Sequence, residues 1–147
     1  MYTLDTSVII NAVEPHEADH VASRQLLGLL RAYHLPIIVP TLVTVEVAGT
    51  MSRLRDANRA QRLVGLLLRL PTVTLIDLDR ALAAQAAALA AAHRLRGADA
   101  VYAAVALRYH TTLVSRDREH LTRLVGIVPV LHPVAALAAL TAAPPTP

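Results

Sequence analysis

The sequence contains no cysteine, no lysine, no tryptophan and no phenylalanine. Without cysteine there can be no disulfides, no thiolate nucleophile and no zinc site built on sulfur. All 14 basic residues are arginine, which excludes a lysine-containing phosphate-binding loop and Schiff-base chemistry. The four tyrosines are the whole aromatic content, so platforms for stacking bases are scarce. Any reaction must therefore use carboxylates, hydroxyls, histidines or arginines.

Long apolar runs are also missing, although 54% of the residues are hydrophobic. No stretch approaches the roughly 18 consecutive apolar residues of a membrane helix. The first residues lack the features of a secretory signal, because Asp5 interrupts them. We therefore expect a cytoplasmic protein without a membrane segment. The net charge of +3 permits a polyanionic partner but does not require one.

The length of 147 residues suits one domain. We expect this domain to span residues 1–133. Residues 134–147 are expected to be a C-terminal tail, with a short apolar segment followed by a disordered, proline-rich end over residues 142–147.

Patterns typical of strands alternate with patterns typical of helices along the chain, which predicts an α/β fold around a parallel sheet covered on both faces. Residues 41–51 are ambiguous, since their valines alternate as in a strand while Pro40 can end a strand and Thr41 can cap a helix. The expected strands are residues 2–4, 35–39, 73–76, 111–114 and 127–131. A helix that carries Val8, Ile9 and Ile10 is expected directly after the first strand. The other expected helices are residues 19–33, 56–70, 80–95, 99–109 and 117–124.

Four acidic residues are placed to meet at one edge of this sheet. Asp5 follows the first strand and Asp117 follows the fourth, while Asp99 lies in the first turn of the helix that leads into the fourth strand. Glu46 lies little more than one turn into the element after the second strand, provided that element is helical. Because ligands bind outside the carboxyl ends of parallel strands, the four side chains are candidates for one site.

Each acid also has an ordinary explanation when it is considered alone. Asp5 and Asp99 can cap helices, and Glu46 can lie on a solvated helix face. Asp117 can cap a helix or pair with Arg116 or Arg118. Clustered carboxylates, however, raise one another's pKa unless a cation neutralises them. Hard oxygen donors without sulfur suit Mg²⁺ or Mn²⁺, and such an ion supports phosphodiester hydrolysis.

Four segments carry a resemblance to a known family: Leu4-Asp5-Thr6-Ser7-Val8-Ile9, Val45-Glu46-Val47, the run from Leu95 to Ala104, and Leu113-Val114-Ser115-Arg116-Asp117. In this order and spacing the chain resembles the PIN-domain ribonucleases, and especially the VapC-type toxins of prokaryotic toxin–antitoxin pairs. The resemblance implies a three-layer α/β/α sandwich with a central, mostly parallel sheet of about five strands. It also implies a helix around Glu46, a homodimer and a cognate antitoxin protein as partner.

The resemblance further implies a role for each matching residue. Asp5 and Asp99 would be direct ligands of Mg²⁺ or Mn²⁺, and Asp117 would assist as a ligand or through water. Glu46 would position or deprotonate the attacking water in the cleavage of RNA. Three hydroxyl residues would support them: Thr6 or Ser7 would orient Asp5 or a metal-bound water, and Ser115 stands where the family often has threonine.

Arginines flank two of these acids and are candidates for contacts with RNA phosphates. They are Arg94, Arg96, Arg116 and Arg118. Two other functions fit the same residues: a housekeeping or DNA-directed PIN nuclease, and a module that uses the acidic pocket for metal-dependent binding without catalysis. Because none of the four acids is missing, the sequence favours an active nuclease.

Overall fold

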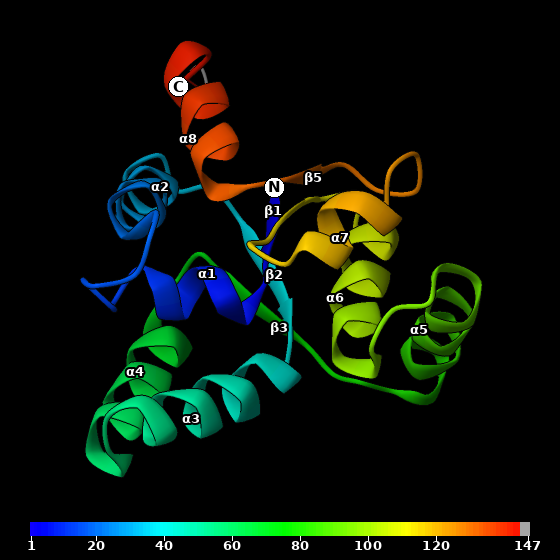
Figure 1. Ribbon diagram of the computed structural model, residues 1–147, viewed down its shortest axis with the longest axis horizontal. Helices are drawn as coiled ribbons and strands as arrows, with labels where there is room; N and C mark the ends of the chain where they lie inside the picture. Colours follow the sequence, from blue (N-terminus) through cyan, green and yellow to red (C-terminus); the bar gives the residue numbers. More distant parts are fainter. Residues whose placement is uncertain (145–147) are drawn as a thin grey trace.

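Strands and helices alternate along the chain as the sequence predicts. A computed structural model describes residues 1–144, which form five strands and eight helices (Figure 1). The strands are β1 (Tyr2–Leu4), β2 (Ile37–Pro40), β3 (Val73–Ile76), β4 (Thr112–Val114) and β5 (Val130–Leu131). The helices are α1 (Thr6–Asn11), α2 (His20–Ala32), α3 (Leu42–Leu54), α4 (Ala57–Arg69), α5 (Arg80–His93), α6 (Gly97–Arg108), α7 (Arg118–Arg123) and α8 (Pro133–Ala142). Within residues 1–144 no helix combines the length and the apolarity needed to cross a membrane.

The five strands form one sheet in the order β3-β2-β1-β4-β5, and every neighbouring pair is parallel. The chain runs outward from β1 to β2 and β3 on one side, then crosses back to β4 and β5 on the other. The carboxyl end of β1 is therefore the point at which the strand order reverses, where open parallel sheets bind their ligands. Asp5 is the residue that follows β1 at this point.

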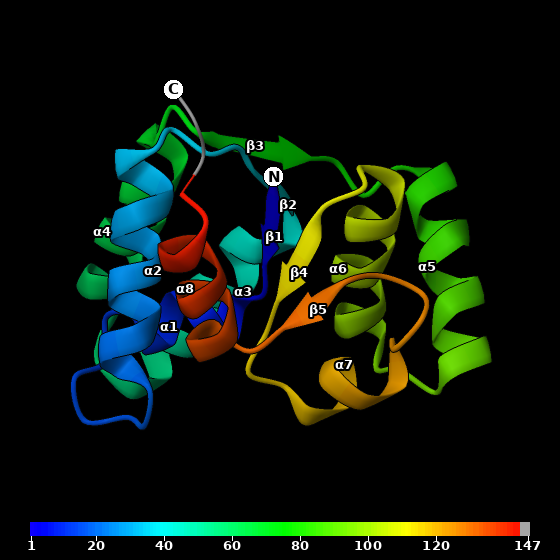
Figure 2. The ribbon, with the colours of Figure 1, turned by 90° about the horizontal axis from the view of Figure 1, so that it is seen from above.

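Helices cover both faces of the sheet, which confirms the predicted three-layer α/β architecture. Figure 2 shows α1, α2 and α8 on one side of the strands and α6, backed by α5, on the other. Every residue of α6 from Ala100 to Ala106 is buried, because this helix lies between the sheet and α5. Its small alanine side chains permit the close approach on both sides.

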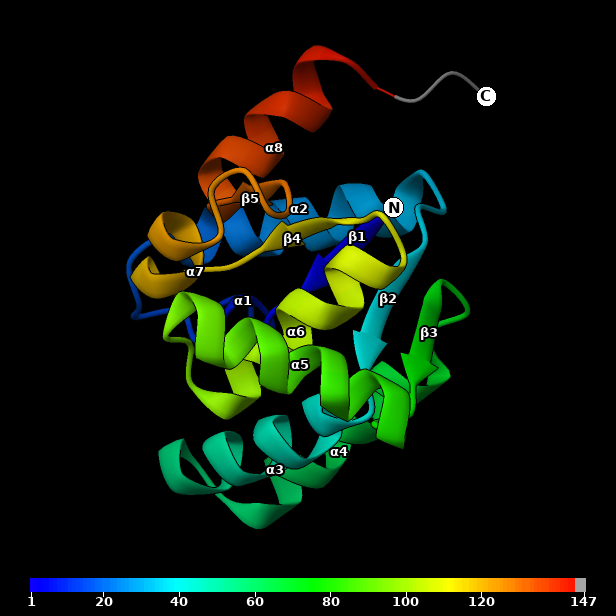
Figure 3. The same cartoon turned by 90° about the vertical axis from the view of Figure 1, so that its right-hand side faces the viewer.

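The ambiguous segment after β2 is a helix. Val43, Val47 and Met51 are buried at intervals of four residues, whereas Val45 is exposed. A strand would have placed all three valines on one face, so burial follows the helical period and not the alternation. Helices α3 and α4 pack against each other as a pair, and Figure 3 shows them at the end of the molecule opposite α8. Glu46 thus projects from a helix.

The apolar segment that we expect to begin the C-terminal tail is helix α8. It packs along α2, and it buries Ala136 and Leu140 in the hydrophobic core. The segment is rich in alanine and apolar on every face, so its sequence has no period that would mark an amphipathic helix. Residues 145–147, which belong to the expected disordered end, lie outside the described residues.

Shortening a buried side chain of α8 is predicted to destabilise the whole domain. Leu140 is 5% exposed, so Leu140→Ala should lower the free energy of unfolding by about 2 kcal/mol or more, measured by urea denaturation. Val134, in the same helix, is 47% exposed, and Val134→Ala should change it by less than about 0.5 kcal/mol. Equal effects of the two substitutions would show that α8 does not pack on the domain.

A partly buried ion pair connects the end of α1 to the end of α3. Glu14 follows α1 and is buried, and its Oε2 accepts a hydrogen bond from Nη2 of Arg55 at 2.7 Å. Arg55 is the residue that ends α3. Its guanidinium lowers the pKa of Glu14 from the usual value of 4.5, an effect that outweighs the opposing influence of burial.

The ion pair should make stability depend on pH on the acid side. Because the pKa of Glu14 is lower in the folded protein, its contribution is present above the ordinary value of 4.5 and is lost as the pH falls through the lowered value. Glu14→Gln removes this contribution, so the wild-type protein should be the more stable of the two at neutral pH, and the difference should shrink below pH 4.5. Urea midpoints from about pH 7 to about pH 3 measure it. A difference that stays constant over this range would contradict the linkage.

Candidate active site

The carboxylate of Asp5 is buried at the carboxyl end of β1 and is held by two serines. The residue is 7% exposed, and its backbone N–H donates to the carbonyl of Val114 in the neighbouring strand at 3.0 Å. Its Oδ2 accepts hydrogen bonds from Ser7 Oγ at 2.5 Å and from Ser115 Oγ at 3.0 Å. Although Asp5 precedes α1, its side chain makes no capping hydrogen bond. Helix capping therefore does not explain this carboxylate.

Ser115 connects Asp5 to the segments that carry the other two aspartates. Its Oγ accepts the backbone N–H of Asp117 at 3.0 Å and lies 2.8 Å from Nδ1 of His120. The other ring nitrogen of His120, Nε2, donates to the backbone carbonyl of Asp99 at 3.0 Å, because a carbonyl oxygen can only accept. One serine and one histidine thus fix the backbone around Asp99 and Asp117 relative to Asp5.

His120 was not among the site residues that we expect from the sequence. It is fully buried in α7 and both of its ring nitrogens have partners in the site. The sequence gives only a weak indication of His120, which lies three residues after Asp117 on the same face of a short helix. Only the packing of α7 against the start of α6 turns that face toward Asp99.

The carboxylate of Glu46 is bound by two other groups, one hydroxyl from α1 and one from α6. Its Oε2 accepts from Thr6 Oγ1 at 2.9 Å and from the phenol of Tyr102 at 2.6 Å. Tyr102 is fully buried, and burial, followed by its hydrogen bond to Glu46, strongly raises the pKa of the phenol. The phenol therefore keeps its proton at neutral pH and acts as a donor. Tyr102 is a second site residue that the sequence alone does not reveal.

Asp99 and Asp117 share one arginine. Nε of Arg96 donates to Oδ2 of Asp99 at 2.8 Å, and Nη2 of the same guanidinium donates to Oδ2 of Asp117. The remaining oxygen of Asp117, Oδ1, accepts the backbone N–H of Glu119 at 2.7 Å and so caps α7. Asp117 thus both caps a helix and forms an ion pair, but its partner is Arg96 and not its sequence neighbours Arg116 and Arg118.

The other arginines expected near the acids have different surroundings. Arg116 donates from Nη1 to Glu17 at 2.7 Å and from Nη2 to the carbonyl of Ala18 at 3.2 Å. Arg94 is exposed and ends α5 in the left-handed conformation, with φ of 54°. Arg118 is exposed at the start of α7 and forms no ion pair within residues 1–144. Arg96 is therefore the arginine that contacts the site acids directly.

The donor set has the chemistry that a hard divalent cation requires, namely carboxylate and hydroxyl oxygens at one edge. Among the described residues no three acidic or histidine side chains form a ready-made metal cage. The guanidinium of Arg96 lies between Asp99 and Asp117 and pairs with both. The two acids are therefore arranged around a cation, and the residues fit a metal ion that takes its place.

Three of the four acids keep one carboxylate oxygen that receives no hydrogen bond from residues 1–144. Both hydroxyl partners of Asp5 bind Oδ2, and both hydroxyl partners of Glu46 bind Oε2. Arg96 likewise donates its hydrogen bond to Oδ2 of Asp99. The free oxygens Oδ1 of Asp5, Oε1 of Glu46 and Oδ1 of Asp99 are thus available to a metal ion or to water.

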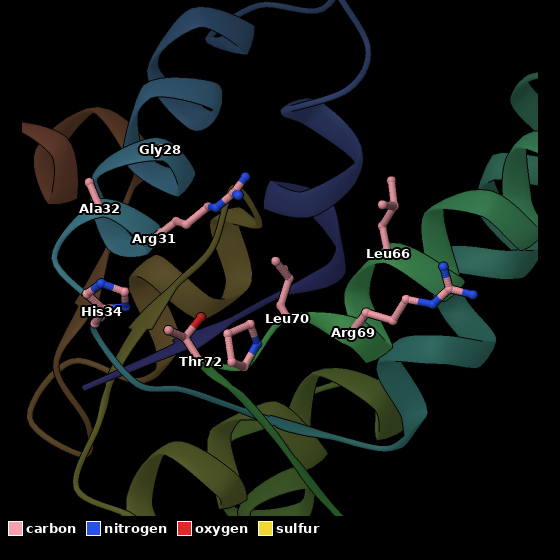
Figure 4. Close-up of a pocket in the computed structure, with 9 residues that line it drawn as sticks. Gly28, Arg31, Ala32, His34, Leu66, Arg69, Leu70 and Thr72 are labelled. Carbon is pink, nitrogen blue, oxygen red and sulfur yellow. The ribbon is translucent and has the colours of Figure 1, made fainter.

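A hollow of ≈ 600 Å³ lies at the opposite edge of the sheet (Figure 4). It is bounded by the ends of α2 and α4 and by Thr72, which precedes β3, whereas the acids follow the carboxyl ends of their strands. Its arginines, Arg31 and Arg69, occupy the last turns of these helices, where a cation complements the helix dipole. Figure 4 shows them extending from the two different helices, with Leu70 between them. This hollow is separate from the acidic site.

The model of the PIN domain family matches residues 2–126, and the chain belongs to this family. The members of this family are nucleases. Three solved structures share the fold of the chain. A search of curated proteins gave no significant match.

By their names, one of these structures is a toxin–antitoxin complex and another is a toxin. A toxin–antitoxin complex from Klebsiella pneumoniae has a TM-score of 0.67 at 19% identity, over 90% of this chain and 98% of that chain. VapC20 of Mycobacterium tuberculosis, a toxin that cleaves the sarcin–ricin loop, has a TM-score of 0.67 at 16% identity, over 77% and 87% of the two chains. The third, FitAcB of Neisseria gonorrhoeae, has a TM-score of 0.67 at 22% identity, over 90% and 98%. At these identities the likeness establishes the fold.

Removing the phenol of Tyr102 is predicted to weaken the support of Glu46. Tyr102→Phe deletes one of the two hydroxyls that bind Oε2, so the free energy of unfolding should fall by about 1 to 2 kcal/mol in urea denaturation. Tyr109→Phe is the matched control, because the phenol of Tyr109 makes no hydrogen bond within residues 1–144. The same loss in both variants would show that the bond to Glu46 contributes nothing.

Proposed function

We propose that the protein is a metal-dependent endoribonuclease that hydrolyses RNA phosphodiester bonds, and that it is the toxin of a VapBC-type toxin–antitoxin pair. The observation that carries the proposal is the arrangement of the acids. Asp5, Glu46 and Asp99 come from three separate segments to the carboxyl edge of the sheet, and each is held by one oxygen while the other oxygen stays free. Such an arrangement serves to bind an ion and a water.

Mg²⁺ or Mn²⁺ would be held by Asp5, Asp99 and Asp117. When bound, such an ion offsets the charge of the phosphate oxygens and lowers the pKa of water. Glu46 is the residue that takes the proton of the attacking water, through its free Oε1. The hydrogen bonds of Thr6 and Tyr102 to Oε2 fix the direction of this carboxylate. Ser7 and Ser115 do the same for Asp5, whose Oδ1 would be free to hold the ion.

Several features support RNA as the substrate. One protein of the same fold, VapC20, is a toxin that cleaves the sarcin–ricin loop. The basic residues near the acids are arginines, and Arg94, Arg96 and Arg118 are exposed. They are suited to phosphate contacts, whereas the scarcity of aromatic side chains disfavours recognition by base stacking. Recognition would then depend on the shape and backbone of the RNA.

The partner follows from the same comparisons. The Klebsiella pneumoniae structure is a toxin–antitoxin complex, and we propose a cognate antitoxin for this chain as well. The homodimer remains a prediction from the family resemblance. The cytoplasmic location and the domain boundary at residue 133 remain predictions from the sequence, with the addition that α8 packs on the domain.

The proposed activity is tested with purified protein and total cellular RNA in the presence of Mg²⁺ or Mn²⁺. Discrete fragments should form and should be absent with EDTA. Asp99→Asn keeps the shape of the side chain but removes the charge that an ion needs, so cleavage should fall by about 100-fold or more. Asp77→Asn, which changes an exposed acid after β3, is the control and should retain activity.

Other outcomes would favour other functions. Fragments that persist in a folded Asp99→Asn variant would contradict the assignment of the site. Cleavage of DNA but not of RNA would identify a DNA-directed PIN nuclease. Binding of metal without cleavage of either nucleic acid would identify a non-catalytic module.

A further inference from the structure

Arg96 occupies the position between two acids that the proposed metal ion also needs. It precedes α6, and its guanidinium reaches Asp99 in the first turn of the same helix and Asp117 at the start of α7. The side chain of Arg96 is 67% exposed, whereas those of Asp99 and Asp117 are 14% and 22% exposed. The arginine therefore covers the two acids from the solvent side.

The contact has a physical function when no ion is bound. Two carboxylates that face one position repel each other, and a cation between them removes the repulsion. The two acids in turn raise the pKa of the Arg96 guanidinium, through the hydrogen bond to Asp99 first. Arg96 thus keeps Asp99 and Asp117 together in the metal-free protein.

The ion pairs of Arg96 with the two acids can be displaced by another cation. The side chain of Arg96 is 67% exposed, so water weakens its ion pairs and a doubly charged ion can displace the guanidinium. A metal ion and Arg96 would also compete for Asp117, because Oδ1 of this residue already caps α7 and Oδ2 is bound by Arg96. Displacement of Arg96 would leave Oδ2 to the ion.

We propose that Arg96 is an exchangeable counter-cation, which neutralises Asp99 and Asp117 in the metal-free protein and moves to a nucleic-acid phosphate when a divalent ion binds. The identity of the ion and of the polyanion rests on the proposed function. Ion binding releases the guanidinium for a phosphate, and a bound phosphate keeps it away from the acids. The two ligands therefore increase each other's affinity through one side chain.

Direct measurement of ion binding tests the exchange without any dependence on cleavage. Protein freed of metal with EDTA and dialysed is titrated with MnCl₂ by isothermal calorimetry. Arg96→Gln removes the competing cation, so it should bind Mn²⁺ about tenfold more tightly than the wild-type protein. Arg118→Gln is the matched control, since it removes the same charge next to Asp117 from a residue that has no ion pair within residues 1–144. Its affinity should change by less than about twofold.

A second measurement tests the movement toward phosphate. Cleavage is suppressed with Glu46→Gln, and binding of a fluorescein-labelled RNA oligonucleotide is followed by anisotropy with and without Mn²⁺ at equal ionic strength. Mn²⁺ should increase the affinity for RNA in Glu46→Gln. The increase should be smaller by about threefold or more in Glu46→Gln combined with Arg96→Gln, because the released guanidinium is missing.

The outcomes separate this inference from the proposed function. Equal or weaker Mn²⁺ binding by Arg96→Gln, with its fold verified by circular dichroism, would overturn the exchange and leave the proposed nuclease untouched. Equal tightening in Arg96→Gln and Arg118→Gln would also overturn it, because general electrostatics would then explain the effect. Absence of Mn²⁺ binding in all three proteins would overturn the metal-dependent function itself.

Discussion

Repulsion between carboxylates is the constraint on which the organisation of this site depends. Acidic side chains that are drawn to one edge of a sheet, and partly out of water, raise the free energy of the folded state unless other groups compensate them. Here different groups compensate the charges of different acids. Serine hydroxyls bind Asp5, Thr6 and Tyr102 bind Glu46, and a single guanidinium binds Asp99 and Asp117. These hydroxyl and guanidinium groups offset the negative charges of the four acids.

The fold supplies these compensating groups from elements that also build the core. Helix α6 carries Asp99 in its first turn and Tyr102 one turn later, and its alanines let it lie close to the strands on one side and to α5 on the other. The backbone of Asp99 is fixed by His120, which is itself part of the buried interior. The same elements thus build the hydrophobic core and position the acids, so the acids are held by the packing of the core.

The compensation also leaves the site ready for further ligands. Hydroxyl groups hold Asp5 and Glu46 by one oxygen each, which fixes the carboxylate without occupying it. The cation beside Asp99 and Asp117 belongs to an exposed, flexible side chain and not to a buried one. Under the proposed exchange, a metal ion would replace the positive charge of Arg96 beside Asp99 and Asp117.

The sequence by itself determined the alternation of strands and helices, the α/β class and the four acids, because apolar periodicity and the position of a residue after a strand are local properties. Tertiary structure decided the rest. In the helix of residues 42–54, Val43 and Val47 face the core while Val45 is exposed, whereas alternation alone would place all three valines on one face. Tyr102 meets Glu46 across 56 residues and Arg96 meets Asp117 across 21, since both contacts depend on which strands and helices become neighbours. No local pattern in the sequence encodes that choice, which is made only when β1 is placed between β2 and β4.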